Sequence, residues 1–159
     1  GAMGGILGPF DSWLLMRGMK TLGIRMDRCQ ENAREIARWL QKVEAVQEVL
    51  YPGVGTPGNS HSHSCQADGP GAIISFRLNE GLSGQRLVES TSVWTLAVSL
   101  GAVESIITLP SRMTHLPYPD DELERLGIDD RLVRLSAGIE DVRDLIEDLS
   151  GAFDALDAG

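Results

Sequence analysis

The sequence predicts an α/β fold, more specifically an α+β sandwich of two layers in which helices cover one face of a mostly antiparallel sheet. Two observations support this prediction. Apolar residues recur at three- and four-residue spacing near both ends of the chain, which indicates helices over residues 11–43 and 142–156. Between them lie short segments rich in β-forming residues, separated by glycine, proline and polar turn residues. The predicted order is therefore helix, strands with interleaved helices, then helix.

Residues 11–43 are predicted to form one long helix or two nearly continuous ones. The periodic apolar positions are Met26, Cys29, Ala33, Ile36, Ala37, Leu40 and Val43. Gly18 and Gly23 weaken the first half of this segment, because a glycine costs about 1 kcal/mol relative to alanine inside a helix. We therefore expect a kink or close packing near these two glycines.

Five strands and two short helices are predicted between the terminal helices. Residues 72–78 give the clearest strand, since β-forming residues partly alternate there before the turn at Asn79–Gly81. Asp120 and Asp121 are expected to cap the second short helix. The remaining strands are predicted at 46–51, 94–100, 106–109 and 132–136, and the short helices at 83–91 and 120–126.

The charge balance disfavours partners with negative surfaces. The 159 residues include 14 basic and 23 acidic side chains, for a formal net charge of -9. Binding to phosphate groups depends on Lys and Arg, so we expect neither a nucleic acid nor an anionic membrane as a partner. No apolar run approaches the length of about 18 residues that a membrane span needs. Two cysteines and no signal-peptide pattern predict a reducing, cytoplasmic setting.

The chain is expected to be one domain of a larger protein. Residues 1–3, Gly-Ala-Met, have the composition that removal of an affinity tag leaves behind, and we exclude them from the fold prediction. Residues 4–159 have the length of a single domain, in which residues 4–45 form a long connecting helix region. An amphipathic helix begins almost at once, with no preceding strand or starting methionine, which leads us to expect further sequence upstream.

Arg134 is unusual because it lies within an otherwise apolar predicted strand. Burying an unpaired guanidinium group is costly, so an anion is expected to meet it. The residues alone leave three explanations open. Arg134 is an exposed strand residue, it pairs with one of the 23 carboxylates of the chain, or it binds a substrate carboxylate through two hydrogen bonds.

Other motifs with chemical potential are weak. His61, His63 and Cys65 alternate along the chain and suit zinc, but the remaining histidine, His115, lies far along the chain without a motif around it. A solvated polar loop is the favoured interpretation, so no metal site is predicted. The sequence also lacks the Gly-x-Ser-x-Gly motif of hydrolases and the glycine-rich patterns that bind phosphate.

Four ordered segments resemble a known family. They are Gly8–Leu22 with Arg25, Met26, Asn32 and Ala33; Ser99–Gly101 with Glu104 and Ser105; Met113–His115; and Leu132–Asp141. Together they resemble the C-terminal half of the pyridoxal-phosphate (PLP) enzymes of cysteine and methionine metabolism. This family includes cystathionine γ-synthase, the cystathionine lyases and methionine γ-lyase. The resemblance covers nearly the whole chain, except that residues 55–71 replace a stretch that is often longer and more charged in the family.

The resemblance implies the small C-terminal domain of a fold-type I PLP enzyme. It also implies that the lysine that binds PLP lies in a large domain upstream, so this chain is expected to contain neither catalytic nor cofactor-binding residues. Only two lysines occur, Lys20 and Lys42, both in predicted helix. Lys20 matches a helix position of the family that is not the PLP lysine. PLP is therefore expected in the full-length enzyme and not in this chain.

The resemblance also assigns substrate-binding roles. Arg134 matches the arginine that binds the α-carboxylate of the amino-acid substrate. Ser99 matches a serine close to that carboxylate, and Thr114 matches a threonine of the same wall. Val98 matches a position where several γ-synthases and cystathionine γ-lyases carry glutamate, while methionine γ-lyases can carry valine. This match favours an apolar thioether substrate.

The resemblance thus predicts the substrate-binding domain of a PLP-dependent carbon–sulfur lyase or γ-replacement enzyme, inactive without its large domain and homotetrameric in the parent protein. It leaves open whether the reaction is β- or γ-elimination or replacement. The alternative is a non-catalytic interaction or structural module that docks through Trp13, Leu14 and Met16 of the first helix. In either case the apolar first turns predict that the isolated chain self-associates.

Overall fold

The computed structural model describes residues 5–54, 63 and 65–157, so the expected tag remnant at residues 1–3 and the candidate ligand His61 lie outside the described residues. The helices are Pro9–Met19 (α1), Leu22–Leu40 (α2), Gly84–Glu89 (α4), Asp120–Leu126 (α5) and Val142–Asp157 (α6), with a 3-10 turn at Pro110–Arg112 (η1). The strands are Val46–Leu50 (β1), Ile73–Leu78 (β2), Thr95–Leu96 (β3), Ile106–Thr108 (β4) and Leu132–Ser136 (β5).

The strands form one five-stranded sheet in the order β1-β2-β5-β4-β3. The β1–β2, β2–β5 and β5–β4 pairs are antiparallel, and only β3 and β4 pair in parallel. The predicted mostly antiparallel sheet is therefore confirmed. β5 is the middle strand, and its residues 134–136 have a strand neighbour on both sides.

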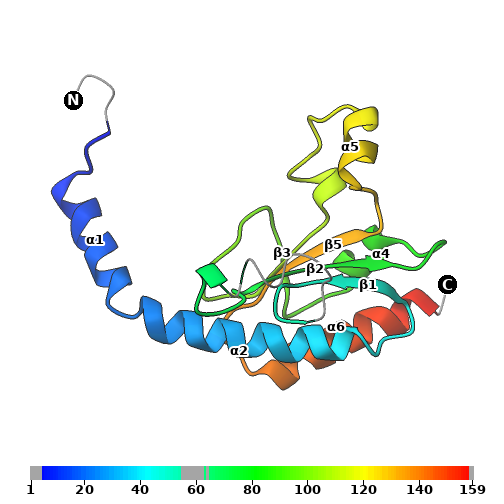
Figure 1. Cartoon of the computed structure of the whole chain (residues 1–159), viewed down its shortest axis with the longest axis horizontal. Coiled ribbons are helices and arrows are strands. Elements are labelled where there is room, and N and C mark those ends of the chain that lie inside the picture. Colours follow the sequence, from blue (N-terminus) through cyan, green and yellow to red (C-terminus); the bar gives the residue numbers. More distant parts are fainter. Residues whose placement is uncertain (1–4, 55–62, 64, 158–159) are drawn as a thin grey trace.

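Helices α2 and α6 lie side by side along one face of the sheet (Figure 1), and α4 contacts both α6 and β5. Side chains that alternate along the strands meet these helices. Ile74 and Phe76 of β2 and Val133 and Leu135 of β5 are fully buried there, together with Leu145 of α6. Each such side chain contributes about 1.5–3 kcal/mol to stability. The two-layer sandwich is confirmed, although α5 stands on the opposite side of the sheet from α2 and α6 (Figure 1).

The predicted N-terminal helix is two nearly continuous helices. α1 ends at Met19 and α2 begins at Leu22, so the break falls between Gly18 and Gly23 as expected. The Arg25 side chain stabilises the break, because its Nη2 donates to the carbonyl oxygen of Gly18 at 2.9 Å and its Nε donates to Thr21 Oγ1 at 3.2 Å. The positive charge of Arg25 is favourable at the C-terminal end of α1, because the carbonyl groups at the end of a helix carry partial negative charge.

Two local predictions were wrong. The strand predicted at 94–100 is only the two residues Thr95 and Leu96, because the backbone leaves the sheet after Ala97, whose N–H still donates to Ile107 O at 3.2 Å. Asp120 and Asp121 do not cap α5. Pro119 occupies the N-cap position, and the two carboxylates lie in the first turn, where they favour the positive end of the helix dipole.

A buried polar network joins α2 to the turn that precedes α6. Asn32 of α2 donates through Nδ2 to the carbonyl oxygens of Gly138 and Glu140, each at 2.9 Å. The fully buried Ser105 donates from Oγ to Glu140 Oε2 at 2.8 Å and accepts from Gly138 N at 2.8 Å. A Cβ atom at Gly138 would lie 2.2 Å from Val103 O, so only glycine fits this turn.

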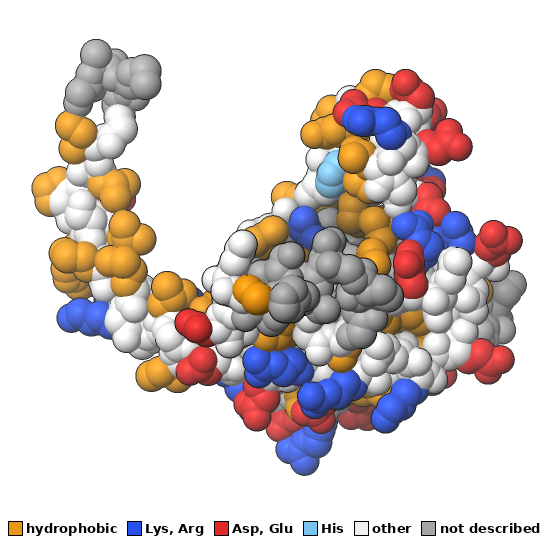
Figure 2. All heavy atoms as spheres, viewed as in Figure 1, with side chains coloured by type: hydrophobic (Ala, Val, Ile, Leu, Met, Phe, Trp, Pro, Cys, Tyr) orange, Lys and Arg blue, Asp and Glu red, His pale blue; other side chains and the backbone are white. Residues whose placement is uncertain are grey.

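Helix α1 has no buried residue and projects from the sandwich (Figure 1). Large apolar side chains stand at positions around the helix axis, at residues 10, 13–16 and 19, and Figure 2 shows those on the face in view; Phe10 and Trp13 remain 68% and 52% exposed. A helix that is apolar all round is normally buried on all sides. Within the described residues, no helix has both the length and the apolar character of a membrane span.

The exposed α1 surface predicts self-association of the isolated chain. In sedimentation velocity, the average sedimentation coefficient should rise with protein concentration, because association buries apolar area. The double variant Trp13→Glu/Leu14→Glu should reduce this rise. Val93→Glu, which adds a charge at an exposed apolar residue outside α1, should leave it unchanged. A wild-type chain that stays monomeric at every concentration would contradict the prediction.

The buried network predicts a large effect of Asn32→Ala. One buried and one partly buried carbonyl group would lose their donor, which should lower the free energy of unfolding by about 2–3 kcal/mol. Urea unfolding followed by circular dichroism measures this change. The control Gln85→Ala removes a hydrogen bond to Glu89 on the surface of α4 and should change stability by less than about 0.5 kcal/mol. Equal losses in the free energy of unfolding for the two substitutions would contradict a stabilising role of the network.

Candidate functional site

The candidate site lies on the face of the sheet opposite to the helix layer. Along β5, the buried Val133 and Leu135 point into the core, and the half-buried Arg134 between them points to the other face. Its neighbours across the strands are Ser75 on β2 and Thr108 on β4. The middle strand thus presents a guanidinium group flanked by two hydroxyl-bearing residues.

One nitrogen of the Arg134 guanidinium is fixed by two acceptors. Nη2 donates to the carbonyl oxygen of Ser99 and to Thr108 Oγ1, each at 3.3 Å. The first acceptor belongs to the segment after β3, and the second to β4. Two different parts of the chain therefore hold the same end of the side chain.

The remaining nitrogens of Arg134 have no partner among the described residues. Nε is buried without a hydrogen bond, and no described carboxylate lies within ion-pair distance of the group. Leaving a buried N–H of a charged group unpaired costs about 1–3 kcal/mol or more. Of the three explanations that the sequence left open, the exposed residue and the internal ion pair therefore do not describe Arg134.

Burial lowers the pKa of Arg134 from its usual value. The direction shows that desolvation of the guanidinium outweighs the compensation that its present neighbours supply. An arginine nevertheless stays charged at neutral pH. A bound anion would offset the desolvation, so Arg134 is the candidate anion-binding side chain of this face.

Residues 97–101 form a segment beside Arg134 that is attached at both ends. At one end Thr108 Oγ1 donates to Ala97 O at 2.6 Å, and at the other Gly101 N donates to Ser136 Oγ at 2.9 Å. Gly101 has a φ of 76°, which favours glycine there. Between these attachments Val98 is 61% exposed. The structure thus brings the predicted residue Ser99 into contact with Arg134, through its carbonyl oxygen, and Val98 precedes it in the same segment.

Thr114, the fourth predicted site residue, lies in the loop that follows η1. Its Oγ1 is 2.9 Å from His115 Nδ1 and forms a hydrogen bond with this ring nitrogen. Among the described residues, no hydrogen bond joins Thr114 to Arg134 or to residues 97–101. The role that the family resemblance gives to Thr114 is therefore not supported by a contact.

Thr108 and Ser136 are residues of the site that the sequence prediction missed. Both are buried polar residues on strands that adjoin Arg134 or contain it. A threonine that follows Ile106 and Ile107 in a short apolar run was a weak signal of a polar role. Its contact with Arg134 depends on the register of β4 against β5, and register between distant strands cannot be read from the residues alone.

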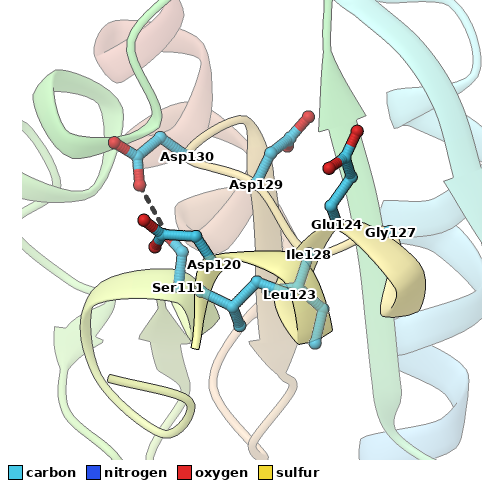
Figure 3. Close-up of a pocket in the computed structure, with 8 residues that line it drawn as sticks. All are labelled: Ser111, Asp120, Leu123, Glu124, Gly127, Ile128, Asp129 and Asp130. Atoms are coloured by element: carbon cyan, nitrogen blue, oxygen red, sulfur yellow. Dashed lines mark hydrogen bonds between the residues drawn. The ribbon is translucent and has the colours of Figure 1, made fainter. Parts of the chain in front are cut away.

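A hollow between α5 and residues 127–130, separate from the surroundings of Arg134, is acidic (Figure 3). Its lining includes the four carboxylates of Asp120, Glu124, Asp129 and Asp130. Arg112, which hydrogen-bonds Asp130, holds the pKa of that carboxyl below its usual value. Asp129 is likewise paired with Arg77 and Arg131. Asp120 and Glu124 have no ion pair among the described residues, so their charges disfavour the carboxylate of an amino acid in this hollow.

The described part of the chain contains no group of three or more His, Cys, Asp or Glu side chains that could hold a metal ion. His63 Nε2 is instead 2.9 Å from Gly69 O, and Cys65 is exposed. Cys29 is buried, and burial raises the pKa of its thiol, which makes it a poor nucleophile.

The residues present do not fit covalent attachment of PLP. Lys20 and Lys42 are the two lysines of the chain. Both are exposed, one just after α1 and the other shortly after α2. Neither therefore has the desolvated surroundings that activate a lysine.

Comparisons with known proteins identify the family of the chain. Residues 1–154 match the family model described as Cys/Met metabolism PLP-dependent enzyme. The chain is 46% identical over 153 residues to cystathionine gamma-lyase of Bacillus subtilis and 43% identical over 155 residues to L-methionine gamma-lyase of Fusobacterium nucleatum. These matches cover 96% of this chain and 40% and 39% of the two relatives.

Solved structures give the same result. Cystathionine gamma-lyase from Lactobacillus plantarum, in complex with L-serine, superposes with a TM-score of 0.94 at 44% identity. Cystathionine gamma synthase from Xanthomonas oryzae, in complex with cystathionine, superposes with a TM-score of 0.91 at 39% identity. The matches cover 98% and 99% of this chain and 41% of each of those chains. The chain spans about 40% of the length of its relatives and belongs to the PLP-dependent enzyme family of cysteine and methionine metabolism.

Proposed function

We propose that this chain is the substrate-binding C-terminal part of a PLP-dependent carbon–sulfur lyase or γ-replacement enzyme that acts on sulfur amino acids. The observation that carries the proposal is the Arg134 guanidinium, which is partly desolvated, has an unpaired Nε and has no carboxylate partner among the described residues. An α-carboxylate would supply the missing negative charge and would accept from Nη1, which makes no hydrogen bond with a described residue. The relatives solved with L-serine and with cystathionine hold ligands that carry such a group.

Arg134 contributes by orienting the substrate. Nη2 is held by Ser99 O and Thr108 Oγ1, so the guanidinium plane is fixed before the substrate arrives. A carboxylate that pairs with this fixed group and accepts from its Nη1 is held in position and direction. Fixing a reactant in this way lowers the entropy cost of the reaction step. This chain would therefore supply binding and orientation, while PLP would supply the electron-withdrawing chemistry when it is bound by the rest of the enzyme.

Val98 is proposed to contact the substrate side chain. It is exposed next to Ser99, and an apolar side chain there favours a thioether over a charged group. Identities of 46% to a cystathionine gamma-lyase and 43% to a methionine gamma-lyase do not separate the two substrate classes. We therefore assign the class of sulfur amino acids and no single member of it.

The rest of the proposal concerns the parent protein. The large domain that holds PLP would lie upstream, and the parent enzyme would be a cytoplasmic homotetramer. The exposed apolar residues of α1 are compatible with such contacts. The isolated chain would be inactive. A non-catalytic module docked through α1 remains the competing function, favoured by the same exposed surface.

An exchange of segments tests the proposal. The 40% of the Bacillus subtilis cystathionine gamma-lyase that matches this chain would be replaced by this chain. The hybrid should retain PLP after desalting and cleave cystathionine, whereas the isolated chain should do neither. Arg134→Gln in the hybrid should raise KM at least about 30-fold with a smaller change in kcat, because about 2 kcal/mol or more of carboxylate binding is lost.

The matched control is Arg143→Gln, which removes an exposed arginine on α6, on the helix side of the sheet. It should leave KM unchanged. A folded hybrid that is active with an unchanged KM after Arg134→Gln would contradict the role of Arg134. A folded hybrid that retains PLP but has no activity toward sulfur amino acids would favour the non-catalytic module.

A further inference from the structure

The hydroxyl group of Thr108 has a defined polarity. A threonine hydroxyl carries one proton and two acceptor lone pairs. Thr108 Oγ1 donates this proton to Ala97 O, at the short distance of 2.6 Å. Only lone pairs therefore remain on the side of Arg134, where Oγ1 accepts from Nη2 at 3.3 Å. Thr108 cannot turn its proton toward the guanidinium without giving up the shorter bond.

Thr108 holds two components of the site at once. Its bond to Ala97 O attaches residues 97–99 to β4, and this attachment places Ser99 O where it accepts the other hydrogen of Arg134 Nη2. Both acceptors of Nη2 thus depend on one side chain. Thr108 is itself fully buried, so it cannot touch a ligand on the open face of the sheet.

Ser75 provides the contrast. It lies opposite Arg134 on the other flanking strand, β2, and is half-buried. No hydrogen bond between Ser75 and Arg134 is present among the described residues. Each strand next to Arg134 therefore places one hydroxyl-bearing residue opposite it. Among the described residues, only the one on β4, Thr108, accepts a hydrogen bond from Arg134.

We propose that Thr108 is a positioning residue for the candidate carboxylate site, which fixes the Arg134 guanidinium and the 97–99 segment in the orientation that receives an anion. This inference rests on the proposed function for the identity of the anion. The fixed geometry itself does not depend on it. Nη2 is held, and Nη1 makes no hydrogen bond with a described residue and is not among the buried atoms without a partner. Nη1 thus remains accessible to an incoming carboxylate.

The test uses the 159-residue chain labelled with 15N, and follows the side-chain Nε–H signal of Arg134 by NMR. Without ligand, the 15N relaxation of this signal should indicate an ordered guanidinium in the wild type and in Thr108→Ser. Thr108→Val should show faster internal motion and faster hydrogen exchange. Ser75→Ala is the matched control and should match the wild type. Should Thr108→Val fail to fold, Thr108→Ala replaces it with the same expectation.

Propionate serves as the anion, and propionamide as its uncharged counterpart. Propionate should shift the Arg134 signal, and Thr108→Val should weaken propionate binding about tenfold, the effect of one lost hydrogen bond to a charged group. Thr108→Ser should restore binding. Arg134 order and propionate affinity that are unchanged in folded Thr108→Val would overturn the inference.

The two proposals fail in distinguishable ways. If propionate leaves the wild-type Arg134 signal unchanged, or if propionamide has the same effect as propionate, the assigned carboxylate site is wrong. The relaxation and exchange of the unliganded variants still decide the role of Thr108. If propionate binds but Thr108→Val is as ordered as the wild type, the carboxylate site stands and the positioning role is wrong.

Discussion

The candidate site depends on the alternation of side chains along the middle strand of the sheet. Val133 and Leu135 of β5 must face the helix layer to complete the core, and this requirement forces Arg134 onto the opposite face. A guanidinium in the middle of a sheet has strands on both sides and little water. The same packing that stabilises the domain therefore places a partly desolvated cation where the described residues provide no anion. The position of the proposed binding residue follows from the fold, because the stability of β5 and the position of Arg134 cannot be changed separately.

The sequence was sufficient for the elements with strong periodicity. Apolar spacing predicted α2 and α6, and composition predicted β5. The break near Gly18 and Gly23 was also predicted, and an arginine within an apolar run indicated the candidate site. The segment after Trp94 was misjudged because its composition is that of a strand, whereas its backbone carbonyls serve Thr108 and Arg134. Thr108 itself was missed because its contact depends on the register between strands, which tertiary packing decides.

The residues that carry the family resemblance serve two purposes. Asn32, Ser105, Gly138 and Glu140 form a buried network that joins α2 to the turn before α6. Arg134 and Ser99 belong to the open face instead. Relatives with different names share this fold at TM-scores above 0.9. Under the proposed function, substrate choice depends on exposed residues such as Val98 and on the part of the relatives that this chain does not span.

The most direct test of this account is a crystal structure of the hybrid enzyme with L-serine bound. The account predicts that the serine carboxylate lies within hydrogen-bond distance of the Arg134 guanidinium, while Ser99 O and Thr108 Oγ1 still accept from Nη2. Arg134 would then have its missing anion, and the domain would be the carboxylate-binding half of the site. A carboxylate held by another cation, with Arg134 turned away from it, would contradict the account.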